Sequence, residues 1–238
     1  NSCANIVYSG VGKTEAEIEN AIKSGVGCIN LESRDELKMI LAIAKQLGIV
    51  LPVSVRVNPN VNPNTHPYIS TGLKENKFGV PIEDARELYE LVSNSEWLVP
   101  IGIACHIGSQ LTDSNPVIEA VREVVHLAEE LKRIGIPLKD IDVGGGLGIK
   151  YDNERKNLDY KKYSNSILNF KNKHKCKIIF EPGRSIIGSA GVLASKVIYM
   201  KENKTKIFVI LDAAMNDLIR PALYNARHRI IPAIKNKK

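Results

Sequence analysis

The fold class is indicated most clearly by GCINLESRDELKMILAIAKQLGIVLPVSVRVN, residues 27–58. An apolar run is followed by a helical pattern from Ser33 to Gly48, and a second apolar run comes directly after it. Ser33 and Glu36 have the spacing of a capping box at the start of that helix, and Gly48 supplies its end. The second run is too apolar for a strand with one face in water. The stretch therefore predicts two parallel strands that are covered by helices.

The same unit recurs along the chain. Thr14 and Glu17 form another expected capping box, at the start of a helix over residues 14–25. Further helices are expected over residues 82–94, 116–134 and 160–170. Strands are expected at NIVYS, GCINL, LPVSVRV, IGIACHI, IDVGGGLGI and KIIFEP. An open doubly wound sheet and a (β/α) barrel both fit this alternation.

The polar residues at the strand ends favour the barrel. A dinucleotide-binding sheet concentrates its functional residues after the first strand, whereas a (β/α)8 barrel places them at the ends of many strands. Here every strand is followed by polar residues or glycine: Ser9 and Gly10, Glu32, Arg56 and Asn58, His106 and Ser109, Gly144 to Gly146, and Glu181 to Arg184. We therefore predict an α/β fold of the TIM-barrel type.

The predicted barrel is incomplete. Six strand–helix units precede residue 190, whereas a closed barrel of this type needs eight. The segment VLASKVIYMKENKTKIFVILDAAM, residues 192–215, instead predicts two strands with a turn at residues 202–204. We expect a partial barrel over residues 1–191 and the beginning of a truncated β-domain over residues 192–238.

Composition excludes several classes of protein. The net charge is +7, but the 33 Lys and Arg residues are spread along the chain, and only KNKK at 235–238 is dense, so nucleic-acid binding is not expected. No apolar run is long enough to predict a membrane span. The four cysteines form no CxxC pair, which argues against a metal centre or a disulfide framework and favours the reducing cytoplasm.

Two glycine-rich stretches resemble phosphate loops. YSGVGKT at residues 8–14 ends like a Walker A motif, but Val7 stands where the first essential glycine should be. GGGLG at residues 144–148 lacks the acidic residue that a dinucleotide site has at the end of the next strand. Its N–H groups are suited to a single phosphate group, and an ordinary turn is the alternative.

Three side chains at strand ends are candidates for the same site. Arg184 in EPGR, residues 181–184, has paired donors for a phosphate or carboxylate, and an internal salt bridge is the alternative. His106 offers a ring that can stack on a flat cofactor, or it is purely structural. Arg56 alternates with valines and should point into the barrel, where it needs an acidic neighbour or a ligand.

Five motifs together resemble one enzyme family. They are HIGSQ (106–110), DVGGGLGI (142–149), EPGRSI (181–186), THPYISTGLKENKFG (65–79) and NDLIRPALY (216–224). In this order they resemble the diaminopimelate decarboxylases, which are fold-type III enzymes that use pyridoxal 5′-phosphate. The implied reaction converts meso-2,6-diaminoheptanedioate to L-lysine, and the family is expected to form homodimers. The alternatives are a non-catalytic remnant and a sister decarboxylase for ornithine, arginine or carboxynorspermidine.

The resemblance implies a role for each matched residue. His106 would stack on the cofactor ring, and Glu181 would pair with its pyridine nitrogen, so that the ring accepts electrons as carbon dioxide leaves. Arg56 would tune the surroundings of the ring. The remaining cofactor contacts would come from Ser109, Gly144, Gly145, Gly146, Pro182, Gly183 and Arg184, and the substrate contacts from Arg184, Arg220 and Tyr224.

The resemblance also implies what this chain lacks. The family's Schiff-base lysine lies in a YAxKAN-type motif on the first barrel strand, and a CESxD-type motif lies in its β-domain; neither is found here. The first strand of this chain corresponds to the third of the family. Lys13 matches a different position, so we do not expect it to replace the missing lysine, and we expect the fragment to be inactive alone.

Overall fold

The computed structural model describes residues 3–62, 77–151 and 158–234. All six predicted strands are present in one parallel sheet, in the order β1-β2-β3-β5-β6-β7. Their bounds are β1 Val7–Tyr8, β2 Cys28–Leu31, β3 Leu51–Asn58, β5 Leu98–Ala104, β6 Asp140–Gly145 and β7 Lys177–Glu181. A short strand that was not predicted, β4 Val80–Pro81, pairs with the end of β3. The incomplete (β/α) barrel is therefore confirmed.

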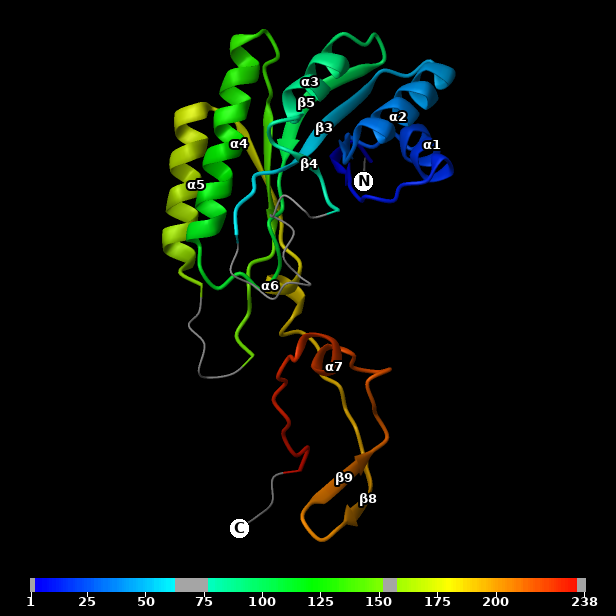
Figure 1. Ribbon diagram of the computed structural model, residues 1–238, viewed down its shortest axis with the longest axis vertical. Helices are drawn as coiled ribbons and strands as arrows, with labels where there is room; N and C mark the ends of the chain where they lie inside the picture. Colours follow the sequence, from blue (N-terminus) through cyan, green and yellow to red (C-terminus); the bar gives the residue numbers. More distant parts are fainter. Residues whose placement is uncertain (1–2, 63–76, 152–157, 235–238) are drawn as a thin grey trace.

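The helices lie on the outside of this curved sheet (Figure 1). They are α1 Glu15–Lys23, α2 Arg34–Leu47, α3 Ala85–Ser93, α4 Asn115–Arg133 and α5 Tyr160–His174. The capping box of α1 is formed as predicted, because Thr14 Oγ1 accepts from Glu17 N–H while the Glu17 side chain accepts from Thr14 N–H. In the described ranges, no helix combines the length and apolar character that a membrane crossing needs.

The capping box predicted for α2 is only half formed. Ser33 Oγ accepts from Glu36 N–H at 3.2 Å, but the Glu36 side chain turns inward instead of returning to Ser33. One Glu36 carboxylate oxygen accepts from Glu32 N–H at 2.6 Å, and the other lies 2.7 Å from Lys13 Nζ. The buried ammonium group of Lys13 therefore binds the carboxylate that would otherwise cap the start of α2.

The core lies between the sheet and its helices. Ile18 of α1, Ile40 of α2 and Val121 of α4 are fully buried against β-strand residues such as Ile29 and Val55. Burial of such aliphatic side chains supplies the main driving force for the fold, about 1.5–3 kcal/mol for each. The strand ends carry the polar residues, so the core holds those ends in fixed relative positions.

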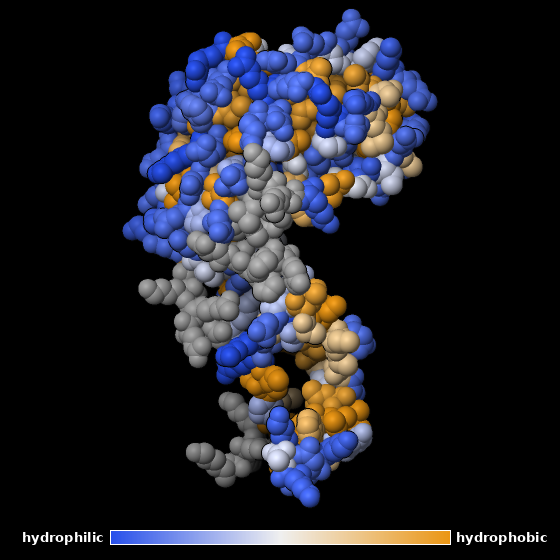
Figure 2. Space-filling view, viewed as in Figure 1, coloured by the Kyte–Doolittle hydropathy of each residue, from blue (hydrophilic) through white to orange (hydrophobic). Residues whose placement is uncertain are grey.

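The chain continues beyond β7 into an extended arm (Figure 1). A short helix, α6 Arg184–Ile187, is followed by the antiparallel pair β8 Val197–Glu202 and β9 Ile207–Leu211, and then by α7 Arg220–Tyr224. The predicted hairpin is thus confirmed. Many apolar side chains of this arm are exposed, among them Val192 and Ile230. Figure 2 shows apolar surface over the lower part of the molecule, where this arm lies.

Candidate functional site

The ends of three neighbouring strands bring the predicted motifs together. β5 and β6 are paired through Ala104 and Asp142, and β6 and β7 through Gly145 and Glu181. His106 follows β5, and its Nδ1 accepts a hydrogen bond from the N–H of Gly145 at 3.1 Å. HIGSQ, DVGGGLGI and EPGR are therefore adjacent in space, although 39 residues separate His106 from Gly145.

The glycine triplet is required by close backbone packing. A Cβ atom on Gly145 would lie 1.9 Å from the carbonyl oxygen of Glu181, and one on Gly146 would lie 1.8 Å from the carbonyl oxygen of Gly108. Gly144 and Gly146 also adopt positive φ angles of 68° and 82°. The triplet thus forms a tight turn that contacts both neighbouring strand ends.

The N–H groups of this turn are partly engaged within the protein. Gly144 N–H donates to Asp142 Oδ1 at 2.9 Å, and Gly145 N–H donates to His106. The carbonyl of Gly146 accepts from Leu111 N–H at 2.9 Å, which joins this turn to the segment after HIGSQ. The phosphate role predicted for Gly144 to Gly146 stays a prediction, and a phosphate would compete with Asp142 and His106 for two of the N–H groups.

His106 is held in its neutral form. Burial, and after it the nearby positive charge of Arg56, lower the pKa of its ring to about 4. A neutral ring carries a lone pair at Nδ1, which accepts the hydrogen bond from Gly145 N–H. The flat, uncharged ring suits stacking on an aromatic cofactor.

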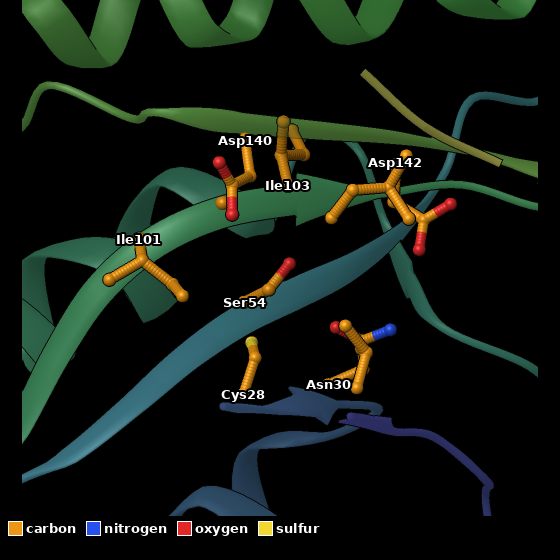
Figure 3. Close-up of a pocket in the computed structure, with 10 residues that line it drawn as sticks. Cys28, Asn30, Ser54, Ile101, Ile103, Asp140 and Asp142 are labelled. Atoms are coloured by element: carbon orange, nitrogen blue, oxygen red, sulfur yellow. The ribbon is translucent and has the colours of Figure 1, made fainter. Parts of the chain in front are cut away.

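Asp142 is a site residue that the sequence analysis did not identify. It is only 4% exposed and lines a small cavity of about 20 Å³ with Asn30, Ser54 and Asp140 (Figure 3). Burial, and then the charge of Glu181, raise the pKa of Asp142 to about 7. Among the described residues, its Oδ2 is a buried atom without a hydrogen-bond partner in the protein. The signal in the sequence was its place two residues before the triplet, inside an apolar strand.

Replacement of Asp142 with asparagine should make the stability difference from the wild type depend on pH. Because the folded state raises the pKa from 3.8 to about 7, the stabilisation from protonated Asp142 is complete below pH 4 and is lost as pH rises through 7. Relative to D142N, the wild type should lose about 4 kcal/mol over this range. Urea unfolding at several pH values measures the difference.

The matched control is Asp35→Asn on the exposed face of α2. Its pKa is lowered by the hydrogen bond from Lys38, so its contribution is lost as pH falls, opposite in sign to that of Asp142 and much smaller because water screens it. A difference between wild type and D142N that stayed constant from pH 4 to pH 8 would contradict the prediction.

Arg184 is oriented by Gln110. Its Nη1 donates to Gln110 Oε1 at 2.9 Å, and Gln110 Nε2 donates to the carbonyl of Ile149 at 2.5 Å. One amide side chain thus links HIGSQ, the end of DVGGGLGI and EPGR. In the part of the chain that the structure describes, the partner found for Arg184 is this amide and not a carboxylate. The sequence analysis missed the role of Gln110, because its partners are 39 and 74 residues away.

Arg56 has the acidic partner that its inward position required. Its Nη1 lies 3.0 Å from Glu32 Oε1, and its guanidinium lies 5.0 Å from the centre of the Phe78 ring. Glu181, at the end of β7, is exposed when the whole residue is considered. Partial desolvation of its carboxylate nevertheless raises the pKa of Glu181, while the positive charge of Arg56 acts to lower it. Arg56 is therefore a positive charge that offsets the carboxylates of this region.

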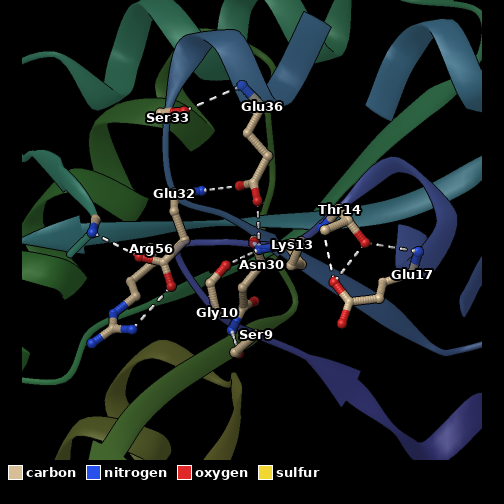
Figure 4. Close-up of polar contacts among 11 residues, drawn as sticks. Ser9, Gly10, Lys13, Thr14, Glu17, Asn30, Glu32, Ser33, Glu36 and Arg56 are labelled. Atoms are coloured by element: carbon tan, nitrogen blue, oxygen red, sulfur yellow. Dashed lines mark hydrogen bonds and ion pairs between the residues drawn. The ribbon is translucent and has the colours of Figure 1, made fainter. Parts of the chain in front are cut away.

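Lys13, from the stretch that resembles a Walker A loop, is buried and fully engaged. Its Nζ donates to the carbonyls of Gly10 and Asn30 at 2.5 and 2.9 Å and pairs with Glu36 at 2.7 Å (Figure 4). These contacts use all three of its N–H donors. The side chain is 1% exposed, so this lysine is a structural residue of the β1 turn.

The predicted substrate residues lie on the C-terminal arm. Arg220 and Tyr224 both belong to α7, so they are one helical turn apart, as expected. The Arg220 guanidinium lies 4.7 Å from the centre of the Tyr151 ring, and its Nη1 lies 3.2 Å from His228 Nε2. The substrate-binding role of Arg220 and Tyr224 stays a prediction. The cofactor-binding roles of Ser109, Pro182 and Gly183 stay predictions as well. The segment over residues 65–76 lies outside the described residues.

The site fits pyridoxal 5′-phosphate in its donors and charges. A neutral ring (His106), a carboxylate at a strand end (Glu181) and a glycine turn with close backbone approach lie on adjacent strand ends. The glycine turn packs its backbone against both neighbouring strand ends, and Arg184 is joined through Gln110 to Ile149, just after that turn.

Comparisons with known proteins agree with this arrangement. Residues 1–188 match the family described as the pyridoxal binding domain of pyridoxal-dependent decarboxylases. The diaminopimelate decarboxylase of Aquifex aeolicus is 49% identical over 227 residues, which cover 95% of this chain and 54% of that protein. That of Neisseria meningitidis serogroup B is 48% identical, over 95% of this chain and 55% of its own length. The chain thus spans about half the length of the curated relatives it matches.

Solved structures show the same likeness. The diaminopimelate decarboxylase of Helicobacter pylori complexed with L-lysine matches with a TM-score of 0.92 and 48% identity, over 96% of this chain and 57% of that one. The lysine/ornithine decarboxylase of Vibrio vulnificus complexed with putrescine matches with a TM-score of 0.77 and 22% identity, over 94% of this chain and 56% of that one. The second match supports the fold alone.

Proposed function

This chain belongs to the pyridoxal-dependent decarboxylases, and on that premise we propose that it is the cofactor-binding part of an enzyme that converts meso-2,6-diaminoheptanedioate to L-lysine. The identity of 48–49% to diaminopimelate decarboxylases supports this substrate. Ornithine, arginine and carboxynorspermidine are therefore the less supported substrates.

The observation that carries the proposal is the hydrogen bond between His106 Nδ1 and Gly145 N–H, which joins two of the motifs at adjacent strand ends. His106 would stack on the cofactor, and Glu181 would hold a proton on the pyridine nitrogen. Gly144 to Gly146, Ser109, Pro182, Gly183 and Arg184 would hold the phosphate side. When bound, pyridoxal phosphate withdraws electrons from the carbon that loses carbon dioxide.

The other parts of the proposal concern the whole enzyme. Arg184, Arg220 and Tyr224 would bind a substrate carboxylate, since arginine offers paired donors for it. We propose a homodimer, a cytoplasmic location in keeping with the free cysteines Cys3, Cys28, Cys105 and Cys176, and a domain boundary near residue 192. The change from parallel strands to the β8–β9 hairpin supports that boundary.

Binding of the cofactor should be non-covalent in this chain. Titration with pyridoxal 5′-phosphate, followed by absorbance, should show saturable binding that pyridoxal without phosphate does not match. Borohydride reduction and peptide mapping should recover no adduct at Lys13, because its Nζ is buried and engaged by three partners. Replacement of His106 with alanine should weaken binding by about tenfold. A stable adduct at Lys13, or no saturable binding, would contradict the proposal.

The substrate is tested best in a chimera. This chain would replace the corresponding segment of the Helicobacter pylori relative, and the chimera would be expressed in a bacterium that lacks its own diaminopimelate decarboxylase. We expect growth without added lysine, and formation of lysine and carbon dioxide from meso-2,6-diaminoheptanedioate but not from ornithine. The matched control is the same chimera with His106→Ala. Equal activity on ornithine would favour the sister decarboxylases, and a folded but inactive chimera would favour the non-catalytic remnant.

A further inference from the structure

We propose that Glu32, Glu36 and Lys13 form a chain of positioning residues that fixes the guanidinium of Arg56 beside the cofactor site. This inference rests on the proposed function and adds three residues to it. None of the three was given a role in the site by the sequence analysis. Figure 4 shows Lys13 in the loop before α1, Glu32 after β2 and Glu36 in the first turn of α2, with the dashed contacts running from Lys13 through Glu36 and Glu32 to Arg56 of β3.

The first step is the contact between Glu32 and Arg56. Glu32 Oε1 lies 3.0 Å from Arg56 Nη1, while Glu32 Oε2 accepts from Gly79 N–H at 2.8 Å. Phe78 packs against the guanidinium. The backbone of Gly79 packs tightly against that of Arg56, since a Cβ atom on Gly79 would lie 2.8 Å from the carbonyl oxygen of Arg56. One buried carboxylate thus joins the end of β2 to β3 and to the residue before β4.

The second step is what holds Glu32 itself. Its own N–H donates to Glu36 Oε2 at 2.6 Å, and the other oxygen of Glu36 pairs with Lys13 Nζ at 2.7 Å. The side chains of Lys13 and Glu32 are 1% exposed and that of Glu36 is 8% exposed, so their charges have little help from water. This network holds two cations, Lys13 and Arg56, and two carboxylates, Glu36 and Glu32. Their formal charges cancel, which offsets the cost of burying them.

The third step is what Arg56 does to the site. Its positive charge lowers the pKa of His106 and acts to lower those of Asp142 and Glu181. It therefore favours a neutral ring at His106 and an ionised carboxylate at Glu181, which are the forms that the proposed cofactor contacts need. Because Glu32 engages Arg56, the guanidinium does not have to pair with Glu181, and that carboxylate stays available for the cofactor.

The test uses nitrogen NMR signals of arginine side chains in the 238-residue chain, with Arg56→Lys to assign the signal of Arg56. In the wild type, the Nη hydrogens of Arg56 should give separate signals, because the bound guanidinium rotates slowly. This measurement does not depend on whether any Glu32 or Lys13 variant folds. Glu32→Gln should merge them, and Lys13→Met combined with Glu36→Leu should broaden them. Glu17→Gln, the same chemical change at the exposed start of α1, should leave them unchanged.

Binding of pyridoxal 5′-phosphate is the second readout. Glu32→Gln should weaken it by about tenfold and the Lys13–Glu36 double variant by about threefold, whereas Glu17→Gln should have no effect. Rapidly rotating Arg56 signals in the wild type, or unchanged signals in Glu32→Gln, would overturn the inference. If the wild-type chain bound no cofactor, the proposed function would fail, while the arginine signals would still decide whether Glu32 positions Arg56.

Discussion

Replacement of Lys13 with methionine is expected to lower the free energy of unfolding by about 3–5 kcal/mol. The loss follows from Glu36, which would remain buried and charged without the cation that lies 2.7 Å away. The carbonyls of Gly10 and Asn30 would also lose their donor. Urea unfolding, followed by circular dichroism, measures the change.

Two controls separate this effect from the mere loss of a lysine. In Lys13→Met combined with Glu36→Leu, both charges are removed, and most of the lost stability should return, because apolar side chains of similar size often replace a buried ion pair without loss. Lys23→Met breaks an exposed pair with Glu19 on α1 and should change stability by less than about 1 kcal/mol. Equal effects of Lys13→Met and Lys23→Met would show that the Lys13 pair is not buried in solution.

The replacement of Gly145 with alanine should be similarly damaging. The added Cβ would lie 1.9 Å from the carbonyl oxygen of Glu181 and 2.8 Å from its carbon, so the backbone of β6 or β7 must move. We expect a loss of about 3 kcal/mol in the free energy of unfolding. Cofactor binding should also fall, because the shift separates His106 Nδ1 from the N–H of residue 145.

The matched control is Gly12→Ala. No atom lies within 4 Å of the position of its Cβ, and Gly12 is a glycine that the Walker A interpretation would have needed. We expect a change within about 0.5 kcal/mol in stability and none in cofactor binding. If Gly145→Ala were as harmless as Gly12→Ala in urea unfolding, the close packing of the strand ends would be wrong.

The elements of this fold could be predicted because their signals are local. Thr14 and Glu17 are three residues apart and form the expected capping box, and the apolar runs became parallel strands. The inward direction of Arg56 followed from its alternation with Val55 and Val57, and its acidic partner is Glu32. β4 was missed because two residues are too few to give a periodic pattern.

The pattern for Glu36 shows where local signals are misleading. Ser33 and Glu36 have the spacing of a capping box, yet the Glu36 side chain bonds to Glu32 and Lys13. A buried cation attracts a carboxylate more strongly than an exposed backbone N–H does, because water screens the second interaction and not the first. Gln110 and Asp142 were missed for a related reason, since their surroundings come from other strands.

The barrel type, the count of six strands and the family resemblance follow from the amino-acid sequence, because periodicity, helix caps and motifs depend on neighbouring residues. The role of Lys13, in contrast, follows from long-range contacts. Its partners Gly10, Asn30 and Glu36 come from three different elements, and their convergence depends on how the strands pair and how the helices pack. Burial and charge pairing arise from such long-range contacts, so no local pattern can specify them.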